Sequence, residues 1–178
     1  ATLIRSNLER IGRLTDAFRQ VAVEGKLPDS TRFRIRAAIE DVVASLGPRM
    51  ADGRVELRLS CDEALEIDSI PGDWASIFTN LFSNSLQHGF RGRDHGRIDV
   101  EARISEGRLT VDHSDDGNGM TAETLKRVFD PFFTTDLQHG MGLGMHIVYN
   151  LVTQRFGGEI ACDSEPGAGA HFHIEVPL

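Results

Sequence analysis

The chain has 178 residues and a formal net charge of -8, and its composition is that of an ordinary globular protein. This length predicts one domain, or one domain with an appendage. The negative charge disfavours nucleic acid as a partner, because binding to a phosphate backbone needs clustered Lys and Arg. No apolar run approaches the roughly 20 residues of a membrane span, so the sequence predicts no membrane segment in this chain.

Two cysteines, Cys61 and Cys162, indicate the compartment. They have no metal-ligand spacing, and they are interpreted as buried thiols rather than as a disulfide. Because no signal peptide is visible, they predict a reducing, cytoplasmic environment. The sequence starts without Met inside a helical pattern, which predicts a fragment of a longer protein.

Residues 1–24 predict a helix with a narrow apolar seam. Its apolar residues recur at steps of three and four, at Ile4, Leu8, Ile11, Leu14, Phe18 and Val21. This nearly heptad spacing fits a helix packed on its own domain, and it also fits one piece of a dimeric helical bundle. Residues 25–30 contain Gly25 and Pro28, which break the helix and predict a linker.

From residue 31 to 178 the sequence predicts strands and helices in alternation. We expect strands at 33–35, 55–59, 65–68, 98–104, 109–111, 159–162 and 171–176, and helices at 37–46, 71–88, 121–129 and 143–156. The strands on either side of Glu106 and Gly107 are predicted to form an antiparallel pair. Together these elements predict an α+β fold, a two-layer sandwich of a mixed sheet with helices on one face.

Asn80 and Asn84 lie four residues apart in the predicted helix 71–88, so both amides share one helix face. An amide oxygen is a neutral, hard ligand, and Mg²⁺ accepts one or two such ligands while phosphates and water supply the rest. The alternative is that both amides only cap or hydrogen-bond the nearby backbone.

A second cluster, Asp115-Asp116-Gly117-Asn118-Gly119-Met120, follows the predicted strand 109–111. A carboxylate at a strand end can accept a hydrogen bond from an exocyclic amine such as adenine N6. Gly117 and Gly119 are predicted to adopt positive φ and to let the backbone approach the base. The alternative is a plain Asp-Gly turn.

A third cluster, Gly140-Met141-Gly142-Leu143-Gly144, opens the predicted helix 143–156. The unpaired amides at a helix start can hold phosphates without basic side chains. The cluster lacks the Lys-Ser/Thr of a P-loop and the glycine spacing of a dinucleotide fingerprint. The alternative is a flexible hinge.

The segment between these clusters, residues 129–139, has neither a helix period nor a strand period. We interpret it as a lid with Phe132 and Phe133 as aromatic anchors. The lid contains acidic residues but no Lys or Arg. Phosphate charge therefore has to be met by Mg²⁺, by backbone amides or by residues outside the lid, with Arg91 and Arg93 as candidates.

The order of these clusters resembles the catalytic ATP-binding domain of bacterial sensor histidine kinases, in the GHKL ATPase superfamily. Its N, G1, F, G2 and G3 boxes match Asn-Leu-x-x-Asn at 80–84, Asp-x-Gly-x-Gly at 115–119, Phe-Asp-Pro-Phe-Phe-Thr-Thr at 129–135, Gly-x-Gly-Leu-Gly at 140–144 and Gly-x-Gly at 167–169. The resemblance covers residues from about 30 to 178. Residues 8–23 resemble the end of the family's dimerisation and phosphotransfer hairpin.

The resemblance implies a Bergerat-type fold that binds ATP and Mg²⁺ under a lid. It implies transfer of the γ-phosphoryl group to a histidine on the dimerisation hairpin, which is mostly absent from this chain. It also implies a response regulator receiver domain as an indirect partner and a homodimeric, often membrane-anchored, full-length protein. No histidine lies on residues 1–24, and His113, His146, His171 and His173 are predicted to be packing or structural residues.

Residue roles follow from position in the boxes. Asn84 would be the Mg²⁺ ligand, and Asp115 would accept from adenine N6. Asn80 would lie beside the phosphates and is the predicted catalytic residue. The resemblance places the remaining nucleotide-binding candidates at Gln87, His88, Gly117, Gly119, Met120, Phe132, Thr134, Thr135, Gly140, Gly142, Leu143 and Gly144.

The sequence departs from the family pattern at three places. Gln87 replaces a frequent Lys or Arg, Ala170 replaces a Thr or Ser whose hydroxyl often supports the adenine-binding Asp, and the lid lacks its usual basic residue. These departures keep open a non-catalytic nucleotide-binding or dimerisation module with a degenerate pocket.

The amide of Asn80 separates subclasses within the superfamily. Hydrolytic relatives such as DNA gyrase B usually carry Glu at this position, and so do the anti-sigma-type serine kinases. A Glu can act as general base and an Asn cannot, whereas a neutral His acceptor is already nucleophilic. The sequence therefore favours phosphotransfer to histidine, with the anti-sigma-type serine kinase as the alternative.

Overall fold

The computed structural model describes residues 30–47, 50, 53–136 and 140–178. The predicted helix 1–24 and nearly all of the predicted linker lie outside the described residues. No helix of the described part is both long enough and apolar enough to cross a membrane.

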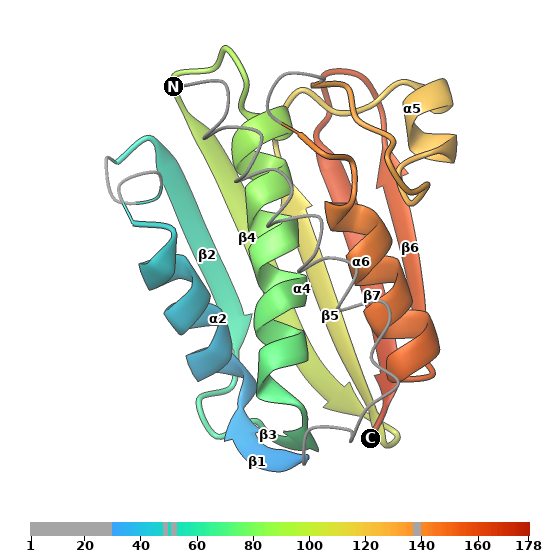
Figure 1. The fold of residues 1–178 in the computed structure, drawn as a ribbon. Coiled ribbons are helices and arrows are strands. Elements are labelled where there is room, and N and C mark those ends of the chain that lie inside the picture. Colours follow the sequence, from blue (N-terminus) through green and yellow to red (C-terminus); the bar gives the residue numbers. More distant parts are fainter. Residues whose placement is uncertain (1–29, 48–49, 51–52, 137–139) are drawn as a thin grey trace, which may run out of the picture.

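The main element is a five-stranded sheet with helices on one face (Figure 1). Its strands lie in the order β2 (Val55–Cys61), β4 (Gly96–Ser105), β5 (Arg108–Asp115), β7 (Ala170–Pro177) and β6 (Glu159–Ser164). β2 and β4 are parallel, and the other neighbours are antiparallel. This mixed sheet with one helical layer confirms the predicted α+β sandwich.

Three helices cover the sheet: α2 (Ile35–Ser45), α4 (Pro71–Asn84) and α6 (Gly144–Asn150). A small antiparallel pair, β1 (Thr31–Arg34) with β3 (Glu66–Ser69), lies at one end of the molecule. The short helix α5 (Ala122–Lys126) lies at the opposite end, beside β6 (Figure 1). The layered arrangement leaves the second face of the sheet uncovered by described helices.

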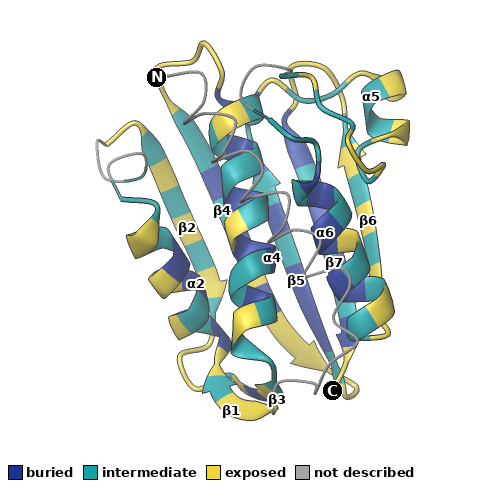
Figure 2. Cartoon of the chain, in the orientation of Figure 1, coloured by how far each residue is buried: buried dark blue, intermediate teal, exposed yellow. Residues whose placement is uncertain are grey.

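Strand alternation separates the two faces of the sheet. Along β7 the residues alternate between buried and half-buried, and Figure 2 shows the buried positions gathered between sheet and helices. Side chains of successive strand residues point to opposite faces. The apolar set therefore meets the helices, while the polar set lies on the open face.

The core is centred on three fully buried aromatic residues of α4, Trp74, Phe78 and Phe82. Trp74 stacks on Phe156 with ring centroids 5.2 Å apart, and its indole Nε1 donates to the Ser69 hydroxyl at 3.0 Å. Full burial of such a side chain stabilises the fold by about 1.5–3 kcal/mol. These contacts anchor the first turn of α4 on Phe156 and on β3, and so help to position the helix that carries Asn80 and Asn84.

The two long helices end in π turns that the sequence did not predict. The predicted helix 71–88 is α4 followed by η1 (Ser85–Gly89), and the predicted helix 143–156 is α6 followed by η2 (Leu151–Arg155). In each π turn the closing amide bonds five residues back, Phe90 N to Ser85 O at 2.9 Å and Phe156 N to Leu151 O at 3.0 Å. The apolar period predicts a helix, but a single π turn at its end is too short to change that period, so the sequence gives no signal for it.

Strand β5 is longer than predicted. It continues past Val111 to Asp115, so the carboxylate is the last residue of the strand and not part of the following loop. Leu109, Val111, His113 and Asp115 all face the helices and are buried. The polar residues at the end of this buried face concealed the alternation in the sequence.

Glycines join the end of β5 to the turn between β6 and β7. A Cβ on Gly169 would collide with the Asp115 carbonyl oxygen, and one on Gly119 would collide with the Glu165 carbonyl oxygen. Gly167 N also donates to Asn118 O at 2.6 Å. The last glycine box therefore holds the backbone around Asp115.

Gly169→Ala and Gly167→Ala form a matched pair that tests this contact. Both residues have φ of +81°, but nothing lies within 4 Å of a Cβ built at Gly167. The shared left-handed conformation costs an alanine about 1–2 kcal/mol, and overpacking at Gly169 adds about 1–3 kcal/mol. Urea unfolding is expected to show the larger loss for Gly169→Ala, and equal losses would contradict the contact.

Candidate functional site

A hollow of about 640 Å³ opens beside the α4–η1 junction and the start of α6. All the predicted nucleotide-binding residues except Gly117 and Phe132 line it: Asn80, Asn84, Gln87, His88, Asp115, Gly119, Met120, Thr134, Thr135, Gly140, Gly142, Leu143 and Gly144. They come from segments far apart in the sequence. The fold thus brings together four of the five predicted boxes at one place.

Gly117 lies behind the hollow, and its backbone does not have the predicted positive φ, unlike Gly119 with φ of 66°. A Cβ on Gly117 would lie 2.6 Å from the Gly89 Cα and carbonyl oxygen. Its lack of a side chain therefore permits close packing of the loop on η1, which is a different reason for glycine from the one predicted.

Phe132 also lies outside the hollow. Its side chain is 59% exposed and its φ is 65°, so the chain turns there and presents Phe133 to the hollow instead. The guanidinium of Arg127 lies 4.3 Å from the centre of the Phe133 ring, a cation–π contact. A pair of adjacent aromatic residues in a loop gives no sequence signal for which one faces inward.

The Asp115 carboxylate lies at the base of the hollow and is 6% exposed. Its Oδ1 accepts from Gly117 N at 2.9 Å, and its Oδ2 accepts from the Ser85 hydroxyl at 2.7 Å. Ser85 Oγ lies 3.0 Å from His113 Nε2. These donors satisfy a carboxylate whose burial would otherwise be costly.

Ser85 and His113 were missed as contributors to the site. His113 was predicted to be a packing residue, and its ring does pack edge-on against Phe82 with centroids 5.2 Å apart, but it also hydrogen-bonds. The available signal was a polar residue on each buried face, since Ser85 continues the apolar stripe of Leu81.

Asn80 and Asn84 differ in their partners. Asn80 Nδ2 donates to Ser76 O at 2.8 Å, and its Oδ1 lies where a Cβ on Gly144 would be 2.9 Å away. Backbone bonding by the amide nitrogen thus aims the amide oxygen at the start of α6. The Asn84 amide lines the hollow and is bonded to no other described residue.

No Lys or Arg occurs among the described residues that line the hollow. The two candidate arginines are engaged at its edge: Arg93 donates to Asp116 O at 2.7 Å, and Arg91 lies 3.8 Å from the Asp136 carboxylate. Within the described part of the chain, positive potential inside the hollow can come from backbone amides, and a bound cation could add to it.

His88 connects η1 to the lid segment. Its Nδ1 lies 3.2 Å from the Thr135 hydroxyl. Burial, together with nearby Arg91, lowers the pKa of His88, and the opposing effect of Asp136 is smaller. His88 is therefore a neutral hydrogen-bonding group at neutral pH and not a phosphate-binding cation.

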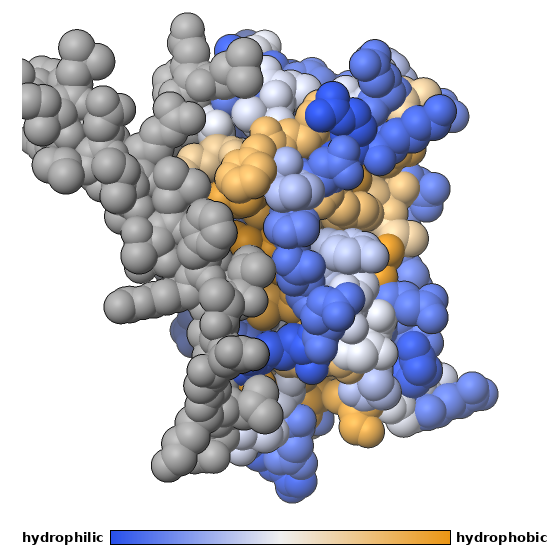
Figure 3. Space-filling view, turned by 45° about the vertical axis from the view of Figure 1, so that its right-hand side comes forward, coloured by the Kyte–Doolittle hydropathy of each residue, from blue (hydrophilic) through white to orange (hydrophobic). Residues whose placement is uncertain are grey.

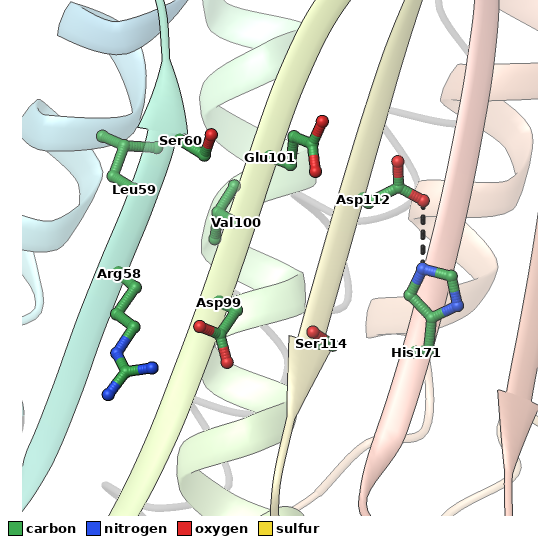
Figure 4. A pocket seen from close by; sticks show the side chains of 9 residues that line it. All are labelled: Arg58, Leu59, Ser60, Asp99, Val100, Glu101, Asp112, Ser114 and His171. Atoms are coloured by element: carbon green, nitrogen blue, oxygen red, sulfur yellow. Dashed lines mark hydrogen bonds and ion pairs between the residues drawn. The ribbon is translucent and has the colours of Figure 1, made fainter.

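A second hollow, of about 560 Å³, lies on the uncovered sheet face (Figure 4). Its side chains include Asp99, Glu101, Asp112 and His171, and the dashed line in Figure 4 joins the last two. Asp112 Oδ1 accepts from His171 Nε2 at 3.0 Å and from His173 Nδ1 at 2.7 Å. Burial raises the pKa of Asp112, but the two imidazoles outweigh it and lower the pKa overall.

That second hollow holds none of the predicted site residues, and its acidic groups are paired with neighbouring basic groups. On the face seen in Figure 3, hydrophilic side chains cover much of the described surface, with apolar patches between them. No cluster of three metal-binding side chains occurs in the described part of the chain. The hollow around Asp115 is therefore the candidate functional site.

The fold and this hollow define a class: a two-layer α+β domain whose amide- and glycine-lined site lies between two helices and a buried carboxylate. The sequence model of one family, described as "Histidine kinase-, DNA gyrase B-, and HSP90-like ATPase", matches residues 71–178. The chain belongs to this family.

Similar proteins include sensor histidine kinases. ZraS of Escherichia coli O157:H7 is 34% identical over 125 residues, which is 70% of this chain and 26% of that protein. Sporulation kinase E of Bacillus subtilis is 28% identical over 178 residues, covering 99% of this chain and 23% of the kinase. The chain spans about a quarter of the length of these curated relatives.

Solved structures share the fold. The catalytic domain of histidine kinase ThkA superposes with a TM-score of 0.73 at 21% identity, covering 84% of this chain and 96% of that chain. The Acinetobacter baumannii histidine kinase AdeS gives a TM-score of 0.81 at 15% identity, covering 99% and 83%. The resemblance of this fold to that of histidine kinase catalytic domains is therefore confirmed.

The environment of His113 predicts a pH dependence of stability. Burial lowers the pKa of His113 to about 3, whereas an unfolded histidine titrates at about 6.5. Between these values the unfolded chain binds a proton that the folded chain does not. The free energy of unfolding therefore falls as the pH falls below about 6.5, by up to about 1.4 kcal/mol per pH unit from this residue.

Urea unfolding at about pH 7 and about pH 5 checks this slope. His113→Gln is expected to lose part of the pH dependence, because its side chain does not titrate. His95→Gln, which removes an exposed imidazole, controls for the loss of a histidine as such. An unchanged slope in His113→Gln would contradict the buried, neutral state of His113.

Proposed function

We propose that this chain is the catalytic ATP-binding part of a sensor histidine kinase, which binds Mg-ATP and delivers the γ-phosphoryl group to a histidine on a dimerisation hairpin. The single observation that supports it best is the convergence of the asparagine, aspartate, lid and glycine clusters on one hollow. Membership of the ATPase family supports ATP as the nucleotide.

The adenine subsite would lie against Asp115. Its Oδ1 accepts one backbone amide, from Gly117, and a carboxylate oxygen can accept a further hydrogen bond from an exocyclic amine. Met120, Ile147 and Ala170 also line the hollow and would supply apolar contact to the base. The subsite would therefore favour a purine with an amine at position 6.

The phosphate subsite would lie between Asn80, Asn84 and the start of α6. The free amide of Asn84 fits Mg²⁺, which takes one or two protein oxygens and completes its shell with phosphate and water. A bound Mg²⁺ would supply the charge neutralisation that the described side chains lack. The amides of Gly142, Leu143 and Gly144 would hold phosphate oxygens.

The site favours phosphotransfer over hydrolysis. Asp115 is the only carboxylate among the described lining residues, and the proposed function assigns it to the adenine subsite. Asn80 cannot accept a proton from water or from a serine hydroxyl. An imidazole acceptor needs no such base, so positioning and charge stabilisation would suffice.

The partners and location belong to the same proposal. The acceptor would be the hairpin of the same protein, in a homodimer, with a response regulator receiver domain as the next acceptor. The structure of ThkA with the response regulator TrrA, which has the same fold at 19% identity and a TM-score of 0.77, makes such a partner reasonable. The domain would work in the cytoplasm.

Purified chain is expected to phosphorylate a separately supplied hairpin that carries a histidine, and to hydrolyse ATP only slowly. Radiolabelled ATP measures both reactions in one tube. The matched control is the same hairpin with the histidine changed to alanine. Rapid steady hydrolysis, or transfer to a serine-bearing partner instead, would contradict the proposal.

Asp115→Asn tests the adenine subsite. Loss of a hydrogen bond to a charged group costs about 1.5–3 kcal/mol, so ATP affinity is expected to fall roughly tenfold to a hundredfold, and GTP affinity to fall less. Asp116→Asn is the control, because the Asp116 carboxylate accepts a hydrogen bond from Arg97 N and does not line the hollow. Equal losses for ATP and GTP, measured by fluorescence titration, would exclude an adenine contact.

A further inference from the structure

Three of the four buried polar or charged side chains of the described residues form one connected chain. They are Ser85, His113 and Asp115, with exposures of 0%, 1% and 6%. Buried polar groups are retained in a core when hydrogen bonds satisfy them. Because this connected set lies next to the proposed ligand hollow, its position indicates a function beyond packing.

The direction of each hydrogen bond follows from the donors available. An ionised carboxylate only accepts, so the single hydroxyl proton of Ser85 goes to Asp115 Oδ2 at 2.7 Å. The Ser85 oxygen then accepts from His113 Nε2 at 3.0 Å. His113 Nδ1 has no partner among the described residues, which fits an unprotonated nitrogen better than a buried N–H. His113 is thus the Nε2–H tautomer.

The π turn accounts for the position of Ser85. Asn84, the last residue of α4, lines the hollow, whereas Ser85 begins η1 and is turned into the core. The Ser85 carbonyl accepts from Phe90 N, which closes the wide turn. π turns within helices occur frequently at functional sites. One helix therefore serves the phosphate side with Asn84 and the buried carboxylate with Ser85.

Strand β7, which pairs with β5 at Asp115, offers no side-chain donor to the Asp115 carboxylate. Ala170 of β7 pairs directly with Asp115 of β5, and directly opposed residues of antiparallel strands place their Cβ atoms about 4.5–5.5 Å apart on the same face. The methyl group of Ala170 cannot donate. The Ser85 hydroxyl is the only side-chain donor to Asp115 among the described residues.

We propose that Ser85 and His113 are positioning residues for nucleotide recognition: His113 Nε2–H orients the Ser85 hydroxyl, which orients Asp115 toward the 6-amino group of the purine. This inference rests on the proposed function. It assigns the support of the base-binding carboxylate to α4–η1 and the middle of β5, and not to β7. Specificity for a 6-aminopurine then depends on two residues that do not touch the ligand.

Ser85→Ala removes the link and leaves the side-chain volume nearly unchanged. Affinity for ATP is expected to fall about tenfold, the effect of a hydrogen bond to a charged group. Affinity for purine riboside triphosphate, which has no group at position 6, is expected to stay at the wild-type value. Fluorescence titration of both nucleotides gives the two changes separately.

A rescue variant separates positioning from general damage to the fold. In Ser85→Ala with Ala170→Ser, a hydroxyl returns from the opposite strand, on the same face as Asp115. ATP affinity is expected to recover most of the loss. Wild-type ATP affinity in Ser85→Ala, an equal loss for both triphosphates, or no recovery in a folded double variant would each overturn the inference.

A ligand-free readout tests the relay independently. Nitrogen NMR of the His113 ring is expected to show one protonated nitrogen, Nε2, in the unliganded wild-type domain and an altered Nε2 signal in Ser85→Ala. A ring protonated at Nδ1 would overturn the relay while leaving the proposed function intact. Failure of the wild-type domain to bind either triphosphate would instead overturn the proposed function, and with it the assignment of specificity.

Discussion

The burial of one carboxylate constrains the architecture of the whole site. Asp115 ends a central strand within the core, where an ionised group is tolerated only if donors surround it. Ser85 comes from the π turn after α4, and the Gly117 amide comes from the loop after β5. The backbone packs closely around Asp115, because a Cβ on Gly117 or Gly169 would collide with neighbouring backbone atoms. The glycine boxes thus pack the chain around a charge as well as serving a ligand.

The proposed phosphate subsite is built from neutral groups, whereas a pocket of basic side chains is the more obvious way to bind phosphate. The described lining includes amides, hydroxyls and glycine backbone, and the nearby Arg93 and Arg91 contact the Asp116 carbonyl oxygen and the Asp136 carboxylate. A salt bridge can neutralise an arginine side chain, whereas a backbone amide keeps its partial positive charge. The helix that follows fixes the direction of these amides. Under the proposed function such a site would depend on a divalent cation for charge balance, so nucleotide and metal would bind as one unit.

Much of the fold and of the candidate site could be predicted from the sequence, and the rest could not. The sheet and its helical layer followed from apolar spacing and turn residues, and most of the candidate lining residues followed from the resemblance to the kinase family. The π turns, the inward choice of Phe133 over Phe132, and the pairing of Ser85 with His113 did not. The hydrogen bonds of Ser85 to His113 and to Asp115 join residues 28 and 30 positions apart, which no local pattern encodes. The departure at Ala170 pointed to a missing donor, but only coordinates reveal the substitute.

Calorimetric titration with a non-hydrolysable ATP analogue tests the central claim that this hollow is a Mg-nucleotide site. The wild-type chain is expected to bind the analogue more tightly with Mg²⁺ than without it, and Asn84→Ala is expected to lose most of that gain while remaining folded. Absence of binding by the folded wild-type chain in the presence of Mg²⁺ would contradict the account and favour a non-catalytic module with a degenerate pocket.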